Sequence, residues 1–99
     1  MCLNLPVFAS TSGLNLSASI TEGQVDLTLI TLAEEDTAAF VIFREEKLDG
    51  GGTLIEIVCN LPSGGSPYTC TDFVVGDNYG VLEVEYDGSV IIYNTIIPK

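Results

Sequence analysis

The stretch that decides the fold is AAFVIFREEKLDGGGTLIEIVC, residues 38–59. Two segments rich in β-branched and aromatic residues, 38–46 and 53–59, flank a turn that contains Asp49 followed by three glycines. Asp-Gly between apolar segments is the strongest local signal of a β-hairpin, because glycine accepts the positive φ of tight hairpin turns. The first segment is apolar on both faces, which favours a strand in the middle of a sheet.

Segments on both sides of this hairpin alternate in the same way. The seven expected strands cover residues 14–20, 24–32, 38–46, 53–59, 68–74, 78–86 and 89–97. Residues 33–37 are expected to form a loop, and Gly80 a bulge that resets the alternation of its strand. Many short strands separated by turn residues, with no competing helix-period segment, predict an all-β, seven-stranded antiparallel sandwich.

The length of 99 residues corresponds to one domain with a modest core. We expect residues 1–13 to be an N-terminal arm and linker, and residues 14–99 to form a single β-sandwich domain. No apolar stretch reaches the ~18 residues that span a bilayer, and residues 1–3 lack the features of a signal peptide. The chain is therefore interpreted as a mature form or as a domain cut from a larger protein.

The chain is strongly acidic. It carries 14 Asp and Glu against 3 Lys and Arg, which gives a formal net charge of −11. Such a charge repels phosphate backbones and anionic lipids, so nucleic-acid binding is not expected. Long-range repulsion also keeps an apolar-rich chain in solution, and this is the favoured interpretation of the acidity. Weak divalent-cation binding and tolerance of high salt are the alternatives.

The cysteines indicate the compartment. Cys59 and Cys70 are separated by ten residues rich in Pro and Gly, so the two sulfurs could meet at the base of a loop. A disulfide there would place the protein outside the cell or at the cell surface, because disulfides persist in oxidising compartments. Two buried free thiols are the alternative. Cys2 is left over, which suggests intermolecular pairing, attachment of a lipid or partner, or no role.

No set of residues predicts catalysis. The chain has no His, so Ser-His and Cys-His pairs are impossible and the commonest general base is missing. Neighbouring carboxylates occur at residues 34–36 and 45–46, and at Glu83 with Glu85. A glycosidase needs two carboxyls that face each other across a cleft. Glu83 and Glu85 share one face of their strand, but this is the expected solvent side. An enzyme is therefore not expected.

Metal and cofactor sites are also not expected. Zinc would need His or a closely spaced cysteine pair, and the chain has neither. Calcium needs a dense cluster of oxygen ligands, of which Asp72 with Asp77, or residues 34–36, could offer only a part. The three glycines at 50–52 are not followed by the lysine and helix of a phosphate-binding loop. Weak calcium binding or a glycan stays open, and no cofactor is predicted.

The order of several motifs is similar to that of a known family. These motifs are GQVDLTL (23–29), an acidic stretch at 31–36, AFVIFRE (39–45), Asp-Gly-Gly (49–51), YTCTD (68–72) and a strand from Tyr79 that ends in Tyr-Asp-Gly (86–88). They resemble fibronectin type III-like modules near the C-termini of secreted and surface-bound bacterial proteins. The resemblance implies an immunoglobulin- or fibronectin III-like sandwich that acts as a spacer or adhesive unit. Ile30 stands where the family usually has Trp, and the cysteine pair is not part of its pattern.

Both ends of the chain are unusually apolar. The candidate assembly residues are Leu3, Leu5, Val7, Phe8, Ile91 and Tyr93. The arm could fold back beside the last strand of its own domain. Alternatively, it could pair along an exposed sheet edge of a neighbouring copy, and such head-to-tail contacts build filaments.

These observations favour a non-enzymatic extracellular structural subunit that self-assembles through its apolar arm into a surface filament or fibre. The alternative is a monomeric adhesion, carbohydrate-binding or spacer module of a larger secreted protein. The two hypotheses differ in the oligomeric state that they predict for the intact chain.

Overall fold

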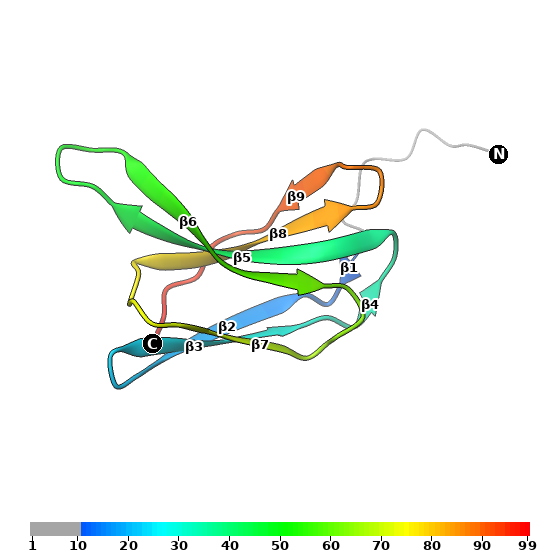
Figure 1. Ribbon diagram of the computed structural model, residues 1–99, viewed down its shortest axis with the longest axis horizontal. Helices are drawn as coiled ribbons and strands as arrows, with labels where there is room; N and C mark the ends of the chain where they lie inside the picture. Colours follow the sequence, from blue (N-terminus) through cyan, green and yellow to red (C-terminus); the bar gives the residue numbers. More distant parts are fainter. Residues whose placement is uncertain (1–10) are drawn as a thin grey trace.

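The computed structural model describes residues 11–99, which form nine β-strands and no helix (Figure 1). The strands are β1 (Thr11–Ser12), β2 (Asn15–Thr21), β3 (Gln24–Ile30), β4 (Ala33–Glu34), β5 (Thr37–Lys47), β6 (Thr53–Pro62), β7 (Tyr68–Asp72), β8 (Asn78–Glu85) and β9 (Val90–Ile92). The all-β, antiparallel prediction is confirmed, but the strand count of seven is wrong. Two short strands, β1 and β4, pair with each other in segments that were assigned to the linker and to a loop.

Two sheets contain the longer strands and lie one above the other (Figure 1). One sheet has the order β2-β3-β7, and the other has the order β6-β5-β8-β9. All neighbouring strands in both sheets are antiparallel. The chain therefore crosses from one sheet to the other after β3, after β6 and again after β7. The central position predicted for the 38–46 segment is confirmed, since β5 lies between β6 and β8.

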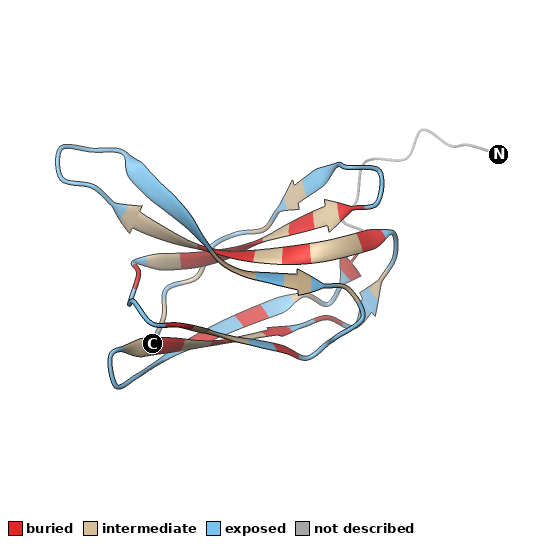
Figure 2. Ribbon diagram, viewed as in Figure 1, coloured by how far each residue is buried: buried red, intermediate tan, exposed pale blue. Residues whose placement is uncertain are grey.

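The core lies between the two sheets, as the buried residues in Figure 2 show. It is built from the alternate positions of each strand that face the other sheet, because successive side chains of a strand point to opposite faces. The buried core residues are Leu16, Ala18, Val25, Leu27, Leu29, Phe40, Ile42, Tyr68, Tyr79 and Val81. The rings of Phe40 and Tyr68 meet edge to face across the interface, with centroids 5.5 Å apart.

The C-terminal segment closes one side of this sandwich. The last strand was expected over 89–97, but β9 ends at Ile92. Ile96 then pairs with Tyr79 of the four-stranded sheet, through two backbone hydrogen bonds of 2.8 Å. Lys99 bonds Ala18 and Ile20 of β2, in the three-stranded sheet. The segment therefore leaves the β9 edge and ends on the β2 edge, so it covers the side of the sandwich where these two edges lie.

The orientation of β8 corrects the predicted surface position of two carboxylates. Tyr79, Val81, Glu83 and Glu85 are all buried, and Glu83 has no exposed surface. The pairing of β8 with β5 runs without a shift from Val84 to Asn78, so one alternation holds from Tyr79 onward. Glu83 and Glu85 therefore face inward with Tyr79, and the prediction that they lie on the solvent side is wrong.

Gly80 does not form the predicted bulge. It pairs directly with Phe43 of β5, and the irregularities of β5 lie elsewhere, at Ile42/Phe43 and at Thr37/Ala39. A Cβ atom at Gly80 would come within 2.3 Å of Cζ of Phe43. The glycine is therefore required because the Phe43 ring lies across this position, and Phe43 is only 4% exposed.

We predict that Gly80→Ala lowers the free energy of unfolding by about 1–3 kcal/mol, because the added methyl group must displace a buried ring. Urea unfolding of the intact chain measures this change. Phe43→Leu in the same background should recover part of the loss, since the shorter side chain leaves room for the methyl group. Additive effects of the two substitutions would show that the Phe43 ring is not the reason for the glycine.

Candidate functional site

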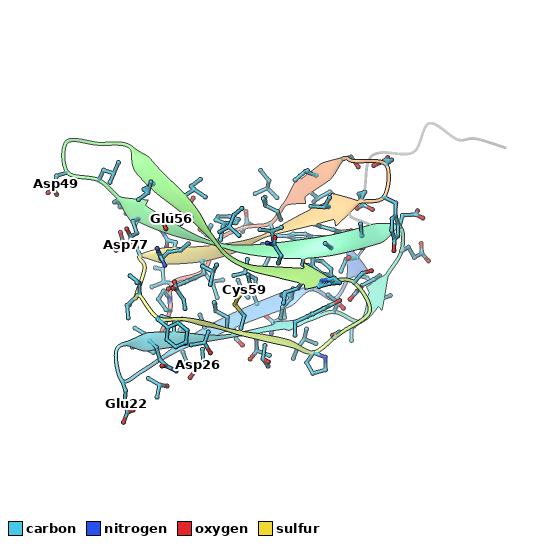
Figure 3. All side chains as sticks on the ribbon, in the orientation of Figure 1. Glu22, Asp26, Asp49, Glu56, Cys59 and Asp77 are labelled. Atoms are coloured by element: carbon cyan, nitrogen blue, oxygen red, sulfur yellow. A yellow bond between two sulfur atoms is a disulfide. The ribbon has the colours of Figure 1, made fainter. Side chains whose placement is uncertain are left out.

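The predicted disulfide is present. Cys59 of β6 and Cys70 of β7 are bonded, with their Cα atoms 6.5 Å apart. Cys59 lies opposite Ile42 of β5 and Cys70 opposite Leu27 of β3, so both flank core positions. Figure 3 shows Cys59 on the side of β6 that faces the other sheet. Since β6 and β7 are edge strands of different sheets, the bond ties the two sheets together along one side of the sandwich.

A buried ion pair makes a second tie between the sheets. Nη1 of Arg44, on β5, lies 2.8 Å from both carboxylate oxygens of Asp72, at the end of β7. The side chains of Arg44 and Asp72 are only 11% and 7% exposed. Nη2 of Arg44 donates to Glu56 at 3.1 Å, and its Nε has a charge contact with Glu46 at 3.4 Å. One cation therefore holds three carboxylates, the most buried of which belongs to the opposite sheet.

Tyr79 completes this cluster from the start of β8. Its hydroxyl donates to Oδ2 of Asp72 at 2.7 Å and accepts a hydrogen bond from the Gly76 N–H at 3.0 Å. Oδ1 of Asp72 accepts from the Val74 N–H at 3.2 Å. The Tyr79 and Asp72 side chains therefore fix the backbone that connects β7 to β8, in addition to the contact between the sheets.

These contacts determine the charge states of the cluster. Burial disfavours the charged form of Asp72, but hydrogen bonds from Arg44, Tyr79 and the Val74 N–H outweigh it and lower its pKa below the ordinary 3.8. The Asp72 hydrogen bond, opposed by burial, raises the pKa of Arg44. Burial and the adjacent Asp72 carboxylate raise the pKa of Tyr79 to about 12. None of the three groups exchanges a proton near neutral pH, so the cluster is suited to holding structure and not to acid–base chemistry.

A third group of polar contacts surrounds Glu83. One of its oxygens accepts a hydrogen bond from Oγ1 of Thr37 at 2.7 Å, and the other accepts from the Tyr93 hydroxyl. Oγ1 of Thr37 also lies 3.2 Å from Oγ1 of Thr11, on β1. Burial and the Glu83 carboxylate raise the pKa of Tyr93, so its hydroxyl stays protonated and donates. Glu83 thereby connects β8 with β5 and with the segment that follows β9.

Glu34 organises the same end of the molecule from β4. Its carboxylate accepts hydrogen bonds from Thr31 at 2.6 Å, from the Tyr68 hydroxyl at 2.8 Å and from the Gly64 N–H at 2.9 Å. Burial disfavours its ionisation, but these three donors lower its pKa overall. The contacts join β4 to β7 and to the Pro/Gly-rich loop after β6. A groove of about 530 Å³ beside them is lined by Glu34, Asp36 and mostly hydroxyl or backbone groups.

The carboxylates considered for calcium are used in other ways. Asp72 is bound by Arg44, and Oδ2 of Asp77 accepts a hydrogen bond from the Lys47 N–H at 2.9 Å. Within residues 11–99, no group of three or more His, Cys, Asp or Glu side chains is arranged to hold a metal ion. In the same residues, no helix is long and apolar enough to cross a membrane.

The candidate assembly residues divide into two sets. Leu3, Leu5, Val7 and Phe8 lie outside the described residues. Ile91 and Tyr93 are half-buried: Ile91 lies opposite Glu83, on the inner side of the sheet, and Tyr93 donates to Glu83. Their role in assembly stays a prediction.

A partly exposed apolar surface was missed by the sequence reasoning. It is the outer side of the four-stranded sheet, here called the outer apolar face. Its residues are Ala39, Val41, Phe43, Ile55, Ile57, Leu82, Val84, Val90 and Ile92. The sequence feature that could have indicated this surface is the presence of apolar residues on both faces of 38–46 and 78–86. A strand with one face in water normally alternates apolar with polar residues. This surface is the candidate functional site with the clearest physical signature.

No protein-family model, no curated protein and no solved structure matches the chain. The fibronectin III-like relationship therefore stays a proposal, and its support must come from the strand arrangement of this chain.

We predict that Asp72→Asn lowers the free energy of unfolding by about 3 kcal/mol near neutral pH, because it breaks a buried ion pair. The folded-state pKa of Asp72 lies below 3.8, so its stabilisation is complete above that pH. The stabilisation disappears as the pH falls through the lower folded-state pKa. Urea unfolding at a series of pH values should therefore show the variant and the natural chain converging in acid.

Asp49→Asn is the matched control for this substitution. Asp49 is exposed in the β5–β6 turn (Figure 3), so the same chemical change there should have little effect at any pH. A constant difference between Asp72→Asn and the natural chain down to strongly acidic pH would contradict the role given to the Asp72 charge.

Proposed function

We propose that this chain is a non-enzymatic, extracellular structural unit with a fibronectin III-like sandwich. The observation that carries the proposal is the use of its buried polar groups. Arg44, Asp72 and Tyr79 connect the sheets at one end, and Glu83 and Glu34 hold strands and loops at the other. The Arg44–Asp72–Tyr79 cluster resists separation of the sheets, which is what a load-bearing or spacing unit requires.

The strand arrangement supports the fibronectin III-like part of the proposal. Three strands pack against four, and the seven longer strands occur in the order expected for a sandwich of this class. Tyr79 lies near the start of β8, and its hydroxyl bonds the backbone of the preceding turn. A tyrosine in this position is a hallmark of immunoglobulin-like sandwiches. This geometry is independent of the motif order from which the resemblance was drawn.

Two further observations support an extracellular, in-line role. The Cys59–Cys70 disulfide favours an oxidising compartment. The described chain begins at β1, beside the start of β2, whereas Lys99 bonds the far part of β2 at Ala18 and Ile20. Figure 1 shows these two places at opposite ends of the sandwich. A unit connected at opposite ends can transmit tension along its length.

Self-assembly through the arm is the specific form of this function that we propose. The arm sequence alternates apolar residues at Leu3, Leu5 and Val7, as an added strand would. The β6 strand forms an edge of the four-stranded sheet, and its Ile55 and Ile57 side chains are exposed. An arm that pairs along such an edge of the next copy forms a contact that repeats without closing. The alternative is a monomeric adhesion, carbohydrate-binding or spacer module of a larger secreted protein, which the placement of β1 and Lys99 at opposite ends of the sandwich favours.

We predict that removing residues 1–10 leaves a folded protein of single-chain mass, whereas the full chain forms larger species. Light scattering after size exclusion measures the masses, and circular dichroism checks that the β-structure is kept. The pair Leu5→Asn and Val7→Asn in the full chain should act like the deletion, because the arm loses its apolar side but keeps its length. Equal masses for the truncated and full chains would contradict arm-mediated assembly and favour the monomeric module.

A further inference from the structure

We propose that the outer apolar face is a second interface, through which two copies of this chain pack sheet against sheet. This proposal does not rest on the arm, because the face extends over β5, β8 and β9, beyond the β6 edge on which the arm is proposed to pair. It begins from the side of the four-stranded sheet that faces away from the core.

The pairing of the strands sets apolar side chains in adjacent rows on this face. One row runs Ala39, Val84, Val90, and the next runs Val41, Leu82, Ile92. Residues that lie opposite each other in antiparallel strands share a face, so each row is a line of neighbouring side chains. The rows cross β5, β8 and β9; on β6 the first row ends in Pro62 and the second in the polar Asn60.

The third row of the face lies toward the β5–β6 turn. Ile57 lies opposite Phe43, which lies opposite Gly80. Phe43 is 4% exposed but does not belong to the core between the sheets, because its ring lies on the outer side over Gly80. The ring fills the hollow that the glycine would leave. The face is therefore continuous across β6, β5 and β8.

Several side chains of this face are open to solvent. Ile92 is 71% exposed, Ile57 65%, Ile55 57% and Val90 52%. Figure 2 shows exposed stretches on both outer strands of this sheet, β6 and β9. Scattered exposed apolar residues are normal, but a contiguous apolar patch marks a surface of association.

The outer side of the other sheet gives the internal comparison. Its rows contain Ser17, Thr28 and Thr69, and then Ser19, Asp26 and Thr71. That side has the polar character expected of a sheet face in contact with water. One molecule thus presents two sheet faces of different character, and the four-stranded one is mostly apolar, with Asn60 as the polar residue of its first three rows.

The distribution of charge identifies a second copy as the occupant. In the described strands, the three apolar rows contain no carboxylate, and the charged Glu45 and Lys47 lie at the end of the face near the β5–β6 turn. A basic partner would be drawn to the other surfaces, which carry most of the 14 acidic residues. Two copies with a net charge of −11 each repel least when they approach through a face without carboxylates.

The size of the face sets the expected strength. Strands about 4.8 Å apart and rows about 7 Å apart give a face of roughly 20 by 25 Å. Two such faces in contact would bury on the order of 1,000 Å² in total, the lower limit for a specific interface. We therefore expect a two-fold dimer with the sheets about 10 Å apart, formed reversibly as the concentration rises.

The test uses the full chain and two variants with matched changes in charge. Ile57→Lys with Ile92→Lys puts two cations on the outer apolar face, at side chains that contribute nothing to the core. Ser19→Lys with Thr69→Lys puts the same charges on the outer side of the three-stranded sheet, where both residues are exposed. Sedimentation velocity over a range of concentrations measures the mass of each.

A second readout separates this interface from assembly through the arm. Methyl NMR with a soluble gadolinium relaxation agent measures how accessible each isoleucine and leucine methyl group is to solvent. Leu82 and Ile92, which lie away from the β6 edge, should become shielded as the concentration rises, whereas Leu32, which is 82% exposed elsewhere, should not. The proposal predicts shielding of Leu82, which every variant keeps, in the natural chain and in the Ser19/Thr69 variant, and its loss in the Ile57/Ile92 variant.

Three results would overturn the proposal. Methyl groups of the outer apolar face that remain accessible to the relaxation agent at every concentration would show that no second copy covers the face. This result would hold whether or not the arm mediates assembly. Shielding at all concentrations with the mass of a single chain would show that a segment of the same chain covers it. Equal masses and equal shielding of Leu82 in the two lysine variants would show that association does not use this face.

Discussion

The disulfide between Cys59 and Cys70 is the constraint on which the rest of the structure depends. It joins the edge strands β6 and β7, so it fixes the spacing of the two sheets on this side of the sandwich. The opposite side is closed by backbone hydrogen bonds of Lys99 to β2. Both sides of the sandwich are therefore held around a core of ten buried residues. The fixed spacing of the sheets also sets the distance between Arg44 and Asp72, which form a buried ion pair.

The sandwich uses its buried carboxylates to hold strands together. Its buried carboxylates accept hydrogen bonds from groups that belong to other strands, as Asp72 does from Arg44 and Glu83 does from Thr37. The outer sides of the two sheets differ in chemical character. One is covered with hydroxyl groups and the other with Val, Ile and Leu side chains. A sandwich with one mostly apolar side is what the proposed association of copies requires.

Sequence patterns predicted local features well, because these depend on neighbouring residues. The hairpin at 38–59 became β5 and β6, and the short spacing of Cys59 and Cys70 allowed the disulfide to be inferred. The burial of Glu83 could not be inferred in the same way. Both phases of 78–86 contain apolar residues, so alternation alone did not decide which side faced inward. The donor that settles it, Thr37, is 46 residues away in the sequence. The bulge predicted at Gly80 was wrong for a related reason. The Phe43 ring that requires a glycine at this position belongs to another strand.

The central claim is that a covalent tie between the two sheets stabilises the sandwich. The most direct test is urea unfolding of the chain with the disulfide intact and after reduction and alkylation. Closing a loop of this length should add about 3 kcal/mol to the free energy of unfolding, so reduction should lower the unfolding midpoint accordingly. An unchanged midpoint, or alkylation of Cys59 and Cys70 without any reductant, would contradict the account.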